Sequence, residues 1–177
     1  MSNIGENNTL TLTMPTANVK EPVRFFGTFQ AKVAAGTNQL TLPKMLKKAV
    51  EEGDEGHLML VPREDQRYWQ LFTRRSFNQI LEDTKSDPKA QEKGRGKKLA
   101  RKLASTALPI ETDTQGRFVI SREFTAKLGG ESNDVVFESA HTHVRLWTQK
   151  DFNAEQERIK AEEADELNEL TRDVLDI

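Results

Sequence analysis

The residues best suited to binding chemistry lie in the segment Asp113–Arg117, which reads DTQGR. The alternating run before it and the apolar run Phe118–Ile120 after it predict two strands joined by a tight turn. Gly116 permits the positive φ that such a turn can need, and Asp113 can accept hydrogen bonds from turn amides or pair with Arg117. An arginine stiffened in this way presents five donors in one plane to phosphate or to a guanine edge. The residues alone leave a second interpretation open, in which the pair only holds the turn together.

The other reactive side chains form no recognisable catalytic or metal site. His141 and His143 lie two residues apart, which would place both on one face of a strand, but no acid or third histidine follows at a ligand spacing. Residues 94–98 (GRGKK) lack the frame of a phosphate-binding loop, and the chain has no cysteine for thiol chemistry. We therefore expect no enzyme, no metal and no cofactor. A small hydrolase built on His141, His143 and nearby acids ranks last among the alternatives.

An internal repeat, offset by about 75–78 residues, organises the elements that would position these side chains. In each copy an apolar run precedes a short helix, two strands and a second helix; the runs are Leu40–Pro43 and Phe118–Ser121. The match is closest at residues 71–77 (LFTRRSF) and 146–152 (LWTQKDF). There the threonine is expected to cap the second helix and the phenylalanine to fold back onto the core.

Each copy is too short to bury a sufficient core by itself. We therefore predict an α+β fold in which the two copies complete each other's core as a pseudo-dimer within one polypeptide. The predicted segments are a disordered start at 1–21, a first unit at 22–81, a basic linker at 82–104, a second unit at 105–152 and an acidic C-terminal helix at 153–177. A short strand is the alternative for the start. The linker is predicted to be loop in its first half and helix from residue 97.

Charge is strongly segregated along the chain, although the formal net charge is only −2. Residues 151–177 carry ten acidic and three basic side chains, a balance of −7 that leaves +5 on residues 1–150. Residues 85–102 hold eight basic and two acidic side chains, which suits either a phosphate-contacting arm or a solvated linker. No apolar run is long enough to cross a membrane and no secretory signal is evident, so we expect a cytoplasmic protein without a membrane partner.

Taken together, these features resemble the MraZ family of bacterial transcriptional regulators. The resemblance rests on residues 25–27 (FFG), the doubled pattern, the DTQGR segment before FVI, and residues 144–147 (VRLW), and it covers about residues 23–165. It implies two tandem swapped-hairpin units of the AbrB type, with double-psi-like β structure. It also implies a ring-like homo-oligomer, located at the nucleoid, that binds direct repeats in promoter DNA.

The resemblance assigns the DNA contacts of the second copy to the Asp113–Arg117 loop. Arg117 would make the principal contact, Asp113 would hold the loop, and Gln115 and Gly116 would complete it. Ser121 stands where the family usually has proline, and it remains a suitable helix N-cap.

The first copy departs further from the family pattern. Aligned on Leu40–Pro43, it has Ala35, Asn38 and Gln39 where Asp, Gly and Arg are expected. Asn38 and Gln39 would then be weaker DNA contacts, since a neutral amide does not replace an arginine. Lys32 and Arg122 flank the loops and are candidate phosphate contacts. The rival to a DNA-binding regulator is an assembly protein that has kept its packing after losing part of its DNA binding.

Overall fold

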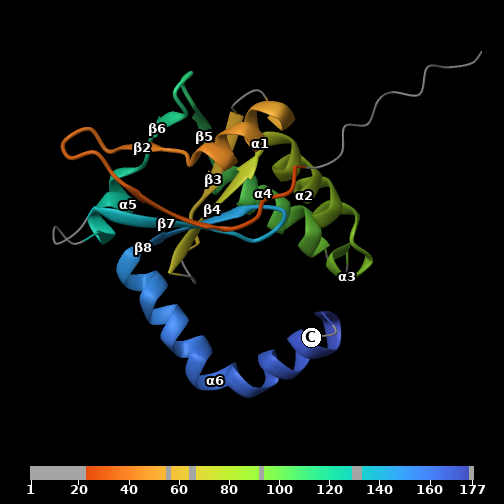
Figure 1. Cartoon of the computed structure of the whole chain (residues 1–177). Helices are drawn as coiled ribbons and strands as arrows, with labels where there is room; N and C mark the ends of the chain where they lie inside the picture. The colour runs from red at the N-terminus through yellow and green to blue at the C-terminus, as the bar shows by residue number, and fades with distance from the viewer. Residues whose placement is uncertain (1–22, 55–56, 64–66, 92–93, 129–132, 176–177) are drawn as a thin grey trace, which may run out of the picture.

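The computed structural model describes residues 23–54, 57–63, 67–91, 94–128 and 133–175. They form an α+β fold whose paired strands are antiparallel (Figure 1). The strands are β1 (Thr28–Lys32), β2 (Gln39–Thr41), β3 (His57–Val61), β4 (Tyr68–Thr73), β5 (Leu108–Glu111), β6 (Arg117–Val119), β7 (Asp134–Ser139) and β8 (Val144–Thr148). The helices are α1 (Lys44–Asp54), α2 (Arg74–Ser86), α3 (Pro88–Gln91), α4 (Arg95–Thr106), α5 (Arg122–Lys127) and α6 (Gln149–Leu175).

Strand pairing joins the two halves of the chain at four places, β1–β7, β2–β6, β3–β5 and β4–β8. Six strands form an antiparallel sheet in the order β1-β7-β8-β4-β3-β5, and β2 pairs with β6 in a separate two-stranded ribbon. The pattern is the same when the halves are exchanged: β1 lies against β7 as β5 lies against β3, and β3–β4 matches β7–β8. The pairs β2–β6 and β4–β8 each join equivalent strands of the two halves. Among the described residues, the first strand of each half, β1 or β5, therefore pairs with a strand of the other half.

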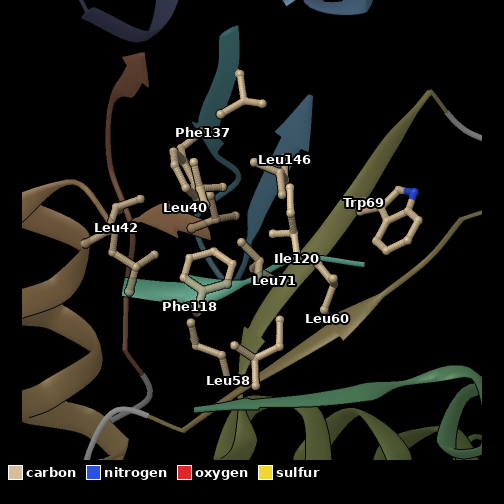
Figure 2. Packing of buried hydrophobic residues seen from close by; sticks show 14 of the residues in the cluster. Leu40, Leu42, Leu58, Leu60, Trp69, Leu71, Phe118, Ile120, Phe137 and Leu146 are labelled. Atoms are coloured by element: carbon tan, nitrogen blue, oxygen red, sulfur yellow. The ribbon is translucent and has the colours of Figure 1, made fainter. Parts of the chain in front are cut away.

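One hydrophobic core is shared by both halves. Leu40 of β2 pairs in register with Phe118 of β6, and both side chains are buried. Figure 2 shows these residues facing the inner side chains of the larger sheet, including Leu71 and Leu146. Leu46 of α1 and Phe124 of α5 also belong to this core. Because each half is too small to bury this much apolar surface alone, the ribbon and the sheet depend on each other.

The predicted helix caps are confirmed. Thr73 Oγ1 accepts a hydrogen bond from the amide of Ser76 at 3.1 Å, and Thr148 Oγ1 accepts one from the amide of Asp151 at 3.1 Å. Ser121 caps α5 through the amide of Phe124 at 3.2 Å. Each hydroxyl satisfies one amide that the first helical turn leaves without an intrahelical partner.

The prediction of a loop in the first half of the basic linker is wrong. Helix α2 continues to Ser86, and α3 begins at Pro88 almost at once. Asp87 explains the restart, because its carboxylate accepts a hydrogen bond from the amide of Lys89 at 2.8 Å. Proline is well suited to the first turn of a helix, where its missing amide hydrogen is not needed. Beyond Gly94, α4 is helical as predicted from residue 97 onward, although it begins at Arg95.

Helices α2 and α4 cover the outer face of β3 and β4. Their contact is built on a second cluster, with Phe72 and Phe77 buried and Ile80 and Leu103 packed against them. In the other half, α6 meets the sheet at its first turns, where Phe152 contacts Trp147, and then runs away from the body (Figure 1). Within the described ranges, no helix is both long and apolar enough to cross a membrane. The expected disorder at 1–21 concerns residues outside the described part of the chain.

Candidate nucleic-acid interface

The loop before β6 holds Arg117 in a defined position. One carboxylate oxygen of Asp113, Oδ1, accepts hydrogen bonds from the amides of Gln115 and Arg117, both at 2.9 Å. The other oxygen, Oδ2, accepts from Nε of Arg117 at 2.6 Å. The carboxylate therefore ties the guanidinium to the backbone of its own loop. This is the arrangement that the spacing of the two residues predicts.

Backbone bonds and α1 complete the loop. The amide of Asp113 donates to the carbonyl of Arg117 at 3.0 Å, and Gly116 has φ +76°, which favours glycine. Lys47 of α1 donates from Nζ to the carbonyl of Thr114 at 2.6 Å. Its aliphatic stem also lies over Gly116, because a Cβ placed there would be 3.0 Å from Lys47 Cδ. The loop of the second half is therefore supported by a helix of the first half.

Arg117 remains accessible at the surface in this arrangement. Its side chain is 43% exposed and that of Asp113 is 38% exposed. The backbone amide of Arg117, with its guanidinium and the amide of Gln115, lowers the pKa of Asp113 despite an opposing effect of partial desolvation. The carboxylate is thus charged at neutral pH. Among the described residues, nothing hydrogen-bonds Nη1 or Nη2 of Arg117, so both groups can donate outward.

The first loop, which precedes β2, is longer than the second, whereas the alignment on Leu40–Pro43 assumed that the two loops have equal length. The amide of Ala34 donates to the carbonyl of Gln39 at 2.7 Å, as that of Asp113 donates to Arg117. Ala34, not Ala35, is therefore the counterpart of Asp113, and the first loop is one residue longer. An alignment from one end of a loop cannot reveal an insertion within it. Either alanine lacks the carboxylate that would hold a neighbouring side chain.

Asn38 does stand at the position of Gly116. Its carbonyl accepts from the amide of Ile120 at 2.9 Å, as the Gly116 carbonyl accepts from Leu42 at 2.9 Å. Asn38 has φ +53°, a conformation that asparagine tolerates better than most residues. Gln39, at the place of Arg117, is half-buried. The first loop thus keeps the backbone turn but lacks the anchored cation.

The β2–β6 ribbon lies between the first loop and the Asp113–Arg117 loop, and its outward-facing side chains form the surface that separates them. Thr41 pairs with Arg117 and Gln39 with Val119, and these side chains alternate with the buried ones. The structure therefore brings Asp113, Gln115, Gly116 and Arg117 together and places Asn38 and Gln39 at the other end of the same ribbon. Exposed Gln115 lies at the tip of the second loop.

The two flanking cations have separate environments. Lys32 ends β1 and forms an exposed ion pair with Asp134 at 3.4 Å. Arg122 is exposed at the first position of α5. Sequence reasoning missed Lys47, which lies in α1, five residues after Leu42, whose amide donates to the Gly116 carbonyl. No local signal identifies Lys47, because its partner Thr114 is 67 residues away.

The two histidines do not share a strand face, contrary to prediction. They lie in the turn before β8, where His141 has φ +63°. His141 is exposed and contacts Phe26, with ring centroids 5.6 Å apart. His143 is half-buried, with Nε2 3.0 Å from Gln70 Nε2 and its ring stacked on Phe72. In the described part of the chain, no cluster of three or more histidine, cysteine or acidic side chains is arranged to hold a metal ion.

His143 makes folding stability depend on pH. Burial, followed by the nearby charges of Arg145 and Arg63, lowers the pKa of His143 from 6.5 to about 4. Between these values the unfolded chain binds a proton that the folded chain does not, so the His143 contribution to the free energy of unfolding decreases as the pH falls. We expect His143→Gln to lose less stability than the native chain between about pH 7 and pH 5 in urea unfolding.

The matched control for this measurement is His141→Gln, which alters the exposed histidine of the same turn. It should retain the His143-dependent loss of stability, because His143 and its contacts with Gln70 and Phe72 are unchanged in this variant. If the native chain and His143→Gln lose the same stability between about pH 7 and pH 5, His143 is not a source of the pH dependence.

Comparison with known proteins finds no match: neither a model of an established protein family nor a curated protein sequence matches this chain. The fold and the site themselves define the kind of protein: an α+β chain whose two halves exchange strands and share one core, with an exposed loop in which a carboxylate holds an arginine.

Proposed function

We propose that this chain is a sequence-specific double-stranded DNA-binding transcriptional regulator that acts on direct repeats in promoter DNA as a ring-like homo-oligomer. The observation that carries the proposal is the fixed position of Arg117. Its Nε is held 2.6 Å from Asp113, while its side chain is 43% exposed. An arginine held in this way can offer its two terminal nitrogens to N7 and O6 of guanine, the commonest specific contact in the major groove.

The symmetric strand pairing supports two tandem swapped-hairpin units of the AbrB type. In this interpretation, β1 and β5 are the exchanged strands, and the β2–β6 ribbon is formed jointly by both units. The anchored loop, the ribbon and the following helix then correspond to the features that make the chain resemble the MraZ family. The chain would be a divergent member, because its first loop has Ala34 and Gln39 at the positions of Asp113 and Arg117.

Because the two loops differ in their side chains, they are expected to contribute unequally to DNA binding. The second loop would read bases through Arg117, with Gln115 beside it, while Asn38 and Gln39 would add weaker contacts. Lys32 and Arg122 would contact phosphates, which position a protein without reading sequence. Repetition of a single strong loop around an oligomer would raise the overall affinity without a new contact. Binding to a promoter would then exclude or reposition RNA polymerase, at the nucleoid and without an enzymatic step.

The test is selection of duplexes from a random-sequence pool, followed by fluorescence anisotropy on a selected duplex and its scrambled version. A sequence-specific regulator should enrich short direct repeats and bind the selected duplex at least about 1000-fold more tightly than the scrambled one. Its affinity should fall steeply as salt rises, because bound cations release counterions from the phosphates. Enrichment of no sequence would contradict the proposal.

The second candidate is an assembly protein that forms a ring but has lost part of its DNA-binding ability. The observation that favours it is the first loop, where Ala34 and Gln39 supply neither the carboxylate nor the cation. Analytical ultracentrifugation separates the two candidates when combined with the selection. A large oligomer that enriches no sequence would support the assembly function.

A further inference from the structure

Helix α4 carries positive charge of one sign on its exposed side. Its sequence, RGKKLARKLAST, contains no acidic residue. Gly96 and Ala100 are buried, on the side of the helix that packs against the body. The basic side chains are all exposed: Arg95, Lys97, Lys98, Arg101 and Lys102. Because 3.6 residues make one turn, these five fall on the side of the helix that faces away from Gly96 and Ala100.

The cations of this face have no acidic partner. Among the described residues, none of the five side chains takes part in an ion pair or a hydrogen bond. By contrast, α1 and α6 pair basic residues with acids one turn away. Lys48 of α1 lies 3.8 Å from Glu52, and Arg158 of α6 lies 2.7 Å from Glu155 and 2.6 Å from Glu162. The charges of α4 therefore remain available for an anion outside the chain.

This arrangement of charge does not help α4 to form. Lys97 and Arg101 are four residues apart, as are Lys98 and Lys102, and like charges at this spacing destabilise a helix. Lys97 also lies in the first turn, where the helix dipole disfavours a cation. The residue before the helix provides no side-chain cap. Packing against the body must therefore hold α4 in place, and helix stability does not account for its charges.

A groove joins the basic face of α4 to the surface beside β6. The groove has a volume of about 900 Å³ and lies between α4 and the start of α5. Lys102 and Arg122 line it, with Glu123 as the acidic residue of the lining. Arg122 follows the end of β6 by three residues, and Arg117 and Val119 of β6 are exposed. Exposed cations thus continue from the second loop, past the start of α5, to α4.

We propose that the exposed face of α4 is a second DNA-binding surface, which contacts the phosphates of a duplex without reading their sequence. Five charges of one sign suit a polyanion, because the field that they create together attracts negative charge. From Arg95 to Lys102 the helix rises by about 10 Å. A DNA strand carries one charge for about each 3.4 Å of helix axis, so this length faces about three phosphates of a strand.

The acidic helix α6 of a second copy is a less suitable partner for this face. Arg158 and Lys160 of α6 already pair with Glu155, Glu157 and Glu162 of the same helix. Binding to α4 would have to compete with these pairs, whereas the phosphates of DNA release only mobile counterions. The inference rests on the proposed function for its partner, a DNA duplex, but it does not require recognition of a sequence.

The test measures how the affinity of the full chain for DNA depends on salt. Fluorescence anisotropy is recorded with the scrambled duplex and with the selected duplex over a range of NaCl concentrations. The double variant Lys98→Gln/Lys102→Gln should make the slope of log affinity against log salt less negative by about 1.8 for each engaged subunit, since each phosphate contact contributes about 0.9. It should weaken binding about tenfold or more at about 0.1 M salt, equally for both duplexes.

The matched control is Lys150→Gln/Lys160→Gln, which changes the net charge by the same amount on α6. Both lysines are exposed, and this variant should keep the native slope. Circular dichroism should stay native in both double variants, because all four side chains are exposed and the α4 substitutions remove a repulsion.

An unchanged slope in folded Lys98→Gln/Lys102→Gln, or an equal change in the α6 control, would overturn the inference. So would dissociation of the oligomer in analytical ultracentrifugation with a native slope, because α4 would then bind an acidic part of a second copy. Failure of the proposed function gives a different result. Duplex binding that depends on α4 without enrichment of any sequence would support the inference and refute the sequence-specific regulator, and selective binding that the α4 variant leaves unchanged would do the reverse.

Discussion

Substitution of Arg117 by alanine is expected to weaken binding to the selected duplex by about 1–3 kcal/mol for each subunit that engages the DNA. The reason is geometric: Asp113 holds Nε of Arg117 at 2.6 Å and leaves the two terminal nitrogens to face a base. The loss should be concentrated at the guanine that Arg117 contacts, so specificity at that position should relax. Anisotropy titrations on the selected duplex and on single-base variants measure both effects.

Two variants distinguish base recognition from simple charge. Arg117→Lys keeps the charge but removes the planar pair of donors, and it should restore little of the lost specificity. Lys32→Ala removes an exposed cation that is paired with Asp134, and it should weaken binding about equally for all sequences. If Arg117→Ala lowers affinity for selected and scrambled duplexes equally, Arg117 is a phosphate contact and the assigned base contact is wrong.

Replacement of Phe118 by alanine should lower the free energy of unfolding by about 3–5 kcal/mol. Phe118 is 2% exposed, pairs with Leu40 and lies at the centre of the core that both halves share (Figure 2). Removing its ring deletes buried apolar surface and leaves a cavity that the surrounding strands cannot fully close. Because the ribbon belongs to both halves, the variant should still unfold in one cooperative step. Urea unfolding followed by tryptophan fluorescence and circular dichroism measures the loss.

Val119→Ala provides the control on the same strand. Val119 is 63% exposed, and its truncation should change the free energy of unfolding by no more than about 0.5 kcal/mol. A loss for Phe118→Ala as small as that for Val119→Ala would show that the ribbon contributes little to the core. Two separated transitions in the native chain would contradict a core shared between the halves.

Features that depend on neighbouring residues could be read from the sequence. The caps at Thr73, Ser121 and Thr148 were predictable, because a hydroxyl reaches an amide only three residues ahead. The same is true of Asp113 and Arg117, which lie four residues apart across one turn. The repeat also indicated that two short copies share a core, since neither has enough apolar surface to fold alone.

Two local predictions failed, one about the basic linker and one about the first loop. Pro88 was interpreted as a sign of loop, yet with Asp87 before it the proline starts α3. The extra residue in the first loop was hidden because the alignment relied on the strand that follows it, and only the hydrogen bond from Ala34 to Gln39 reveals the true counterpart of Asp113.

By itself, the sequence determined the α+β class and the Asp113–Arg117 turn, because each arises from residues a few positions apart. It also determined the repeat, which is visible when the sequence is compared with itself. Tertiary structure alone decided that Lys47 supports the loop from 67 residues away and that His141 and His143 face different partners. These relations depend on which strands pair, and pairing between distant segments is selected by burial of the common core rather than by local spacing.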